Sequence, residues 1–126
     1  MEAIEMKNTV ETIYKIQMAA IKVYEANEAY RTAENAHRQV EYDWTHKDTE
    51  NNDLWMRLLE DSRTKEGLLK KAVNNFFKAV GEPTKKWDLG LQAIYDFNDY
   101  LDNHSGFYYK SPVPEFNIYN CKIRRY

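Results

Sequence analysis

Residues 1–66 contain no glycine and no proline. At average usage, roughly 7% glycine and 5% proline, a stretch of this length should hold about eight of them. These two residues interrupt helices more strongly than any others, because glycine leaves the backbone unrestricted and proline lacks the N–H donor. The first half of the chain is therefore predicted to be long helix.

The first helix is predicted to cover about residues 3–47. It should begin between Glu2 and Thr9, since Asn8 is a good capping residue and Glu11 follows three positions later. It should end within residues 45–53, a run without an aliphatic side chain that is rich in turn-forming residues.

The second helix is predicted over about residues 53–80. Asn52 or Asp53 should cap its start, and Gly81 should stop it, with Pro83 just beyond. Gly67 lies in its polar middle and is a point where this helix could kink.

The third helix is predicted over about residues 84–103, opening near Thr84. It carries apolar residues on one side, namely Trp87, Leu91, Ile94 and Leu101. Residues 106–126 are rich in aromatic and β-branched side chains, which predicts a small β-hairpin or an extended aromatic segment packed on the helices.

These elements predict a mainly α fold in a single domain, residues 1–126. The long N-terminal helix should form an antiparallel helical hairpin or a three-helix bundle. The predicted helices span roughly 60, 42 and 30 Å, so neither shorter helix covers the long one alone. Either the second and third helices line up end to end against the first, or part of its surface is left for another molecule.

A stripe of small residues runs along the first helix at heptad spacing, namely Ala19, Ala26, Ala29, Ala33, Ala36 and Val40. Ala26, Ala33 and Val40 would occupy one core position of the heptad, and Ala29 and Ala36 the other. Small side chains at such a seam allow a partner helix to approach closely, either within the chain or in a homodimer. Alanine is also the best helix former, so the stripe is equally compatible with a partly exposed face.

Composition and charge bound the class of protein. The chain is 43% hydrophobic and 30% charged with a net charge of −2, which excludes wholesale disorder. Its longest apolar run is about four residues, too short to span a membrane, and the acidic start lacks the basic region of a secretory signal. The only cysteine, Cys121, fits a reducing compartment. We therefore expect a cytoplasmic protein.

The sequence offers little catalytic chemistry. Glu34 and His37 are three residues apart and share one helical face. Carboxylate-bridged di-iron bundles use such a glutamate–histidine pair, but they need one pair from each of two helices. The similar pair of Asp43 and His46 lies on the same predicted helix. Four glycines in the whole chain provide no phosphate-binding loop. We expect no catalytic, cofactor-binding or metal-binding residues.

The C-terminal part combines aromatic and basic residues. Asp96, Asp99 and Asp102 lie near the end of the third predicted helix, where they oppose the helix dipole. The basic tail of Lys122, Arg124 and Arg125 is the expected source of compensating charge. The same tail, with its tyrosines, could instead bind single-stranded nucleic acid weakly, because stacking rings and cations alternate.

These features favour a non-enzymatic helical protein that binds a macromolecular partner, most simply another protein. Small helical proteins of this kind are often adaptors or inhibitors, including anti-defence proteins of phages and mobile elements, and we expect this chain to act in the same way. A self-assembling scaffold and a nucleic-acid binder are the alternatives. The residues expected to contact a partner are Tyr14, Tyr24, Tyr30, Tyr108, Tyr109, Tyr119, Lys122, Arg124 and Arg125.

Overall fold

The computed structural model describes residues 10–47 and 51–104, which form three α-helices. These are α2 (Val10–Lys47), α3 (Asn52–Ala79) and α4 (Gly90–His104). The prediction of a mainly helical fold is confirmed for this part of the chain. The predicted start between Glu2 and Thr9 and the predicted hairpin in 106–126 lie outside the described residues.

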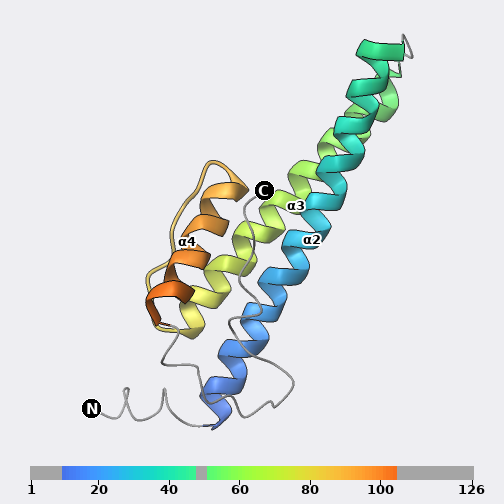
Figure 1. Cartoon of the computed structure of the whole chain (residues 1–126). Coiled ribbons are helices and arrows are strands. Elements are labelled where there is room, and N and C mark those ends of the chain that lie inside the picture. The colour runs from blue at the N-terminus through green and yellow to red at the C-terminus, as the bar shows by residue number, and fades with distance from the viewer. Residues whose placement is uncertain (1–9, 48–50, 105–126) are drawn as a thin grey trace.

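Helices α2 and α3 run antiparallel along most of their length, and α4 lies beside only one half of the pair (Figure 1). The other half, where the two helices are joined, protrudes as a two-helix hairpin. The end-to-end arrangement of the shorter helices is therefore not what this chain adopts. Within residues 10–47 and 51–104, part of the surface of α2 and α3 is left without a third helix.

The boundaries of α3 follow from its capping groups. The side chain of Asn51 accepts a hydrogen bond from the N–H of Leu54 at 3.1 Å, so the cap lies one residue before the predicted Asn52. At the other end Gly81 has a φ of 81°, in the left-handed region that favours glycine. The N–H of Glu82 then donates to the carbonyl of Phe77 at 2.8 Å, which closes a Schellman motif. The predicted stop at Gly81 is confirmed.

Helix α4 begins at Gly90, six residues after the predicted start at Thr84. The reason is that side chains of α3 hold the preceding backbone in a non-helical conformation. Asn74 exchanges two hydrogen bonds with the backbone of Lys85, at 2.8 and 2.9 Å, and Lys70 donates to the carbonyl of Asp88 at 2.8 Å. Backbone groups that a helix would need are therefore already engaged.

The residues of α4 that face the core differ in part from the predicted set. Trp87 precedes the helix, and Leu91, predicted on the core side, is 46% exposed. The residues of α4 that are buried instead are Ala93, Ile94, Phe97 and Leu101. They join a single core cluster with Val80, the C-cap of α3, and with buried residues of α2 and α3, namely Ile16, Ala20, Val23, Leu69, Val73, Phe76 and Phe77.

The seam of α2 packs against α3 of the same chain. Ala26, Ala33 and Val40 are buried or half-buried, whereas Ala29 and Ala36 are exposed. The second core position of the heptad is taken by larger residues, each three positions before a residue of the first: Val23, Tyr30 and His37. The partner helix of the seam therefore lies within the chain, and the exposed alanines lie beside it.

Gly67 does not break or visibly interrupt α3, which is continuous from Asn52 to Ala79. A Cβ atom added at this exposed position would meet no atom within 4 Å. We expect Gly67→Ala to raise the free energy of unfolding by about 0.5–1 kcal/mol, because alanine loses less backbone entropy in a helix. Urea unfolding followed by circular dichroism measures the change.

Gly90 provides the control for that substitution. A Cβ atom there would lie 3.0 Å from Cγ of Glu66 and 3.3 Å from Cδ2 of Leu69, so Gly90→Ala should destabilise the protein. Equal effects at Gly67 and Gly90 would contradict this account of the two positions.

Candidate functional site

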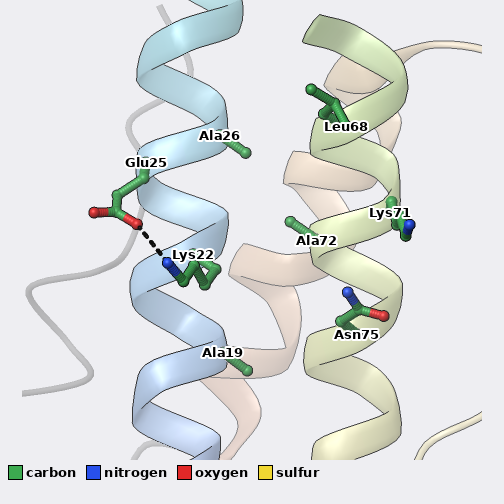
Figure 2. Close-up of a pocket in the computed structure, with 8 residues that line it drawn as sticks. All are labelled: Ala19, Lys22, Glu25, Ala26, Leu68, Lys71, Ala72 and Asn75. Carbon is green, nitrogen blue, oxygen red and sulfur yellow. Dashed lines mark ion pairs between the residues drawn. The ribbon is translucent and has the colours of Figure 1, made fainter. Parts of the chain in front are cut away.

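A groove lies between α2 and α3 on the surface of the helical pair. It forms a hollow of about 550 Å³. In Figure 2 the ribbon of α4 passes behind both helices, so the groove lies on the face turned away from α4. Eight residues line it, four from each helix: Ala19, Lys22, Glu25, Ala26, Leu68, Lys71, Ala72 and Asn75.

The floor of the groove consists of methyl groups. Ala19 and Ala26 point from α2 toward α3, and Ala72 points back from α3 (Figure 2). All three pack against the hydrophobic core from its edge. Because alanine side chains are short, they do not fill the space above the seam, and a shallow hollow is left between the two helices. Two of the three alanines belong to the stripe that the sequence shows on α2.

Leu68 gives the groove an apolar wall that is accessible to solvent. Its side chain is 52% exposed, although neighbouring Leu69 is completely buried. On α2, Ala29 lies three residues beyond Ala26 and is also exposed. Single exposed leucines are common, but here the leucine borders a concave apolar floor. This combination is typical of a surface that receives side chains of another molecule.

The rims of the groove are charged. Lys22 and Glu25 form an ion pair at 3.6 Å along the outer side of α2, and Lys71 lies on the outer side of α3 (Figure 2). Lys71 makes no ion pair with any residue in 10–47 or 51–104. The groove thus combines an apolar floor with cationic side chains on both edges.

The tyrosines expected at a binding surface fall into different environments. Tyr14 and Tyr24 are exposed on α2, whereas Tyr30 is half-buried. None of the three lines the groove. The remaining residues expected to contact a partner lie outside the described part of the chain: Tyr108, Tyr109, Tyr119, Lys122, Arg124 and Arg125.

Tyr30 belongs to a hydrogen-bond network that fixes the start of α4. Its hydroxyl donates to Glu34 at 2.5 Å, with Glu66 at 3.4 Å, and Glu66 accepts the N–H of Gly90 at 2.8 Å. Burial first, and then the two carboxylates, raise the pKa of the Tyr30 phenol well above its ordinary value. The phenol therefore stays protonated and keeps donating. No local sequence pattern indicates this network, because its members lie on three different helices.

The residues considered for metal chemistry do not assemble into a site within 10–47 and 51–104, where no group of three or more metal-ligating side chains comes together. The ring of His37 instead packs on Trp55, with centroids 4.9 Å apart. His46 stacks on Tyr42 at 4.0 Å, near the end of α2.

The charge of Asp96 is already compensated in the described part of the chain. Its carboxylate accepts a hydrogen bond from Nε1 of Trp87 at 2.7 Å and lies 3.5 Å from Nζ of Lys85. The expected pairing of the basic tail with Asp96, Asp99 and Asp102 stays a prediction, because the tail lies outside the described residues.

Comparison with known protein families, with curated proteins and with solved structures finds no match for this chain. None of the helices in the described residues is both long enough and apolar enough to cross a membrane. The groove geometry is therefore the main basis for a functional proposal.

Proposed function

We propose that this chain is a non-enzymatic binding protein that engages a protein partner through the groove between α2 and α3. One observation carries the proposal: an apolar hollow of about 550 Å³ lies open on the face turned away from α4. The helices around it are fixed by a shared core, so the surface is preformed and binding costs little ordering entropy.

The shape of the groove favours a helix as the bound element. Ala19 and Ala26 are seven residues apart, so the floor extends over about two helical turns, or ~10 Å. A helix lying along the floor would present side chains at matching intervals, as in other helix-in-groove complexes. The partner would act as an additional helix beside α2 and α3, and the protein would serve as an adaptor or an inhibitor.

Two leucines of similar exposure provide the test. Leu68 borders the groove and is 52% exposed, while Leu91 lies on α4 and is 46% exposed. In affinity capture from cells of the native host, we expect one dominant partner with the unaltered chain and with Leu91→Glu. Leu68→Glu should lose it, because a carboxylate would stand at the apolar wall.

Equal capture by the two variants, or no dominant partner at all, would overturn the proposal. The same samples test the scaffold alternative when their mass in solution is measured by light scattering. A dimer of the unaltered chain that becomes a monomer only in Leu68→Glu would show that the groove binds a second copy of the protein.

A further inference from the structure

The charged residues in the second half of α3 are all lysines. From Gly67 to Val80 it contains Lys70, Lys71 and Lys78 and no aspartate or glutamate. Lys70 is engaged by the carbonyl of Asp88, and Lys78 lies in the last turn, where the helix dipole favours a positive charge. Lys71 lies two turns before the end of α3, beyond the range of the dipole, so neither explanation applies to it.

The opposite rim of the groove holds a second exchangeable cation. Lys22 pairs with Glu25 three residues later on the same helix, at 3.6 Å, and both side chains are largely exposed. Such surface pairs contribute little to stability, so a carboxylate from another molecule can replace or share the partner of Lys22. Both rims therefore offer an ammonium group beside an alanine floor.

We infer that the partner element is an acidic amphipathic helix, with small apolar side chains on the alanine floor and carboxylates directed at Lys22 and Lys71. This inference rests on the proposed function and adds the chemistry of the partner to it. A helix with basic flanks would place like charges against both rims, which costs affinity and slows association.

A nucleic-acid backbone fits the same surface less well. Its phosphates would pair with the lysines, but the floor consists of methyl groups and offers neither stacking rings nor hydrogen-bond donors to bases or sugars. The protein helix is the occupant that uses both the floor and the rims.

The experiment uses the full-length chain and two synthetic helical peptides of equal length with the same alanine and leucine stripe. One peptide carries glutamate at the positions flanking the stripe, and the other carries lysine there. Fluorescence anisotropy of the labelled peptides gives their affinities at low and high salt. We expect the acidic peptide to bind about tenfold more tightly or better, and its affinity to fall as salt rises.

Substitution at the rim then tests where the preference originates. Lys71→Glu should remove or reverse it, whereas Lys86→Glu, in the connection before α4, should leave it unchanged. Equal affinity for the two peptides, a tighter basic peptide, or displacement of the acidic peptide by a single-stranded oligonucleotide would overturn the inference.

The experiments distinguish failure of the proposed function, a groove that binds a protein partner, from failure of the inference that this partner is an acidic helix. If both peptides bind equally and Leu68→Glu removes both, the groove binds helices without selecting acidic ones, and only the inference is wrong. If neither peptide binds, the groove is not a general site for helices and the inference falls, while capture from the native host still decides the proposed function.

Discussion

Replacing Phe97 with alanine should lower the free energy of unfolding by about 3–5 kcal/mol. The Phe97 side chain is 0% exposed, and its ring meets the ring of Phe76 edge to face, with centroids 4.9 Å apart and an interplanar angle of 80°. Removing the ring costs both its transfer from water and the cavity left among close-packed neighbours. The effect should be large because Phe97 lies where α4 docks onto α3.

Urea unfolding followed by circular dichroism measures this loss, and Tyr95→Ala is the matched control. Tyr95 lies on the same helix two residues earlier, and its ring is 37% exposed. Truncation there removes a similar number of atoms from a partly solvated position, so we expect a loss of about 1 kcal/mol. A loss of the same size for both variants would contradict the packing of α4 described above.

Phe97 was missing from the predicted core set because Trp87 and Leu91 were taken as part of the helical face, although Phe97 lies three residues after Ile94 and four before Leu101. A helix starting near Thr84 places Trp87, Leu91, Ile94 and Leu101 on one side, and that set omits Phe97. The observed helix starts at Gly90 because Asn74, far away in sequence, holds the backbone of Lys85. A local pattern cannot reveal a tertiary hydrogen bond of this kind.

Local chemistry did predict the features that depend on neighbouring residues alone. The absence of glycine and proline predicted long helices, and Gly81 with its left-handed φ ends α3 as expected. Ala26, Ala33 and Val40 lie in or beside the contact between α2 and α3, also as their spacing indicated. The presence of long helices and one core position of the seam could therefore be predicted from the sequence.

Only part of the groove between α2 and α3 could be predicted from the sequence. Ala19 and Ala26 belong to the predicted stripe, but Leu68, Lys71 and Ala72 enter the groove from α3. Their position depends on the register between the two helices, which is set by how the larger residues of both interlock. Ala29 and Ala36 were assigned to the seam because alanines recur there, although the bulkier Val23 and Tyr30 gain more by burial and take the core position.

Because Ala33 is buried and Ala29 is exposed, glutamate at these two positions should change the free energy of unfolding very differently. Ala33 is 6% exposed in the contact between α2 and α3, so Ala33→Glu should lower the free energy of unfolding by about 3 kcal/mol. A carboxylate buried there would lose its hydration. Ala29→Glu places the same side chain on the same helix at an exposed position, where the change should stay within about 0.5 kcal/mol.

Thermal unfolding and light scattering on this pair of variants separate packing within the chain from association between chains. If the seam serves only the fold, Ala33→Glu loses stability and Ala29→Glu changes neither stability nor mass. If a second copy binds beside the seam, Ala29→Glu lowers the mass in solution while its unfolding stays that of a folded monomer. Equal destabilisation by both variants would mean that Ala29 is covered in the folded protein, which contradicts its exposed position in the structure.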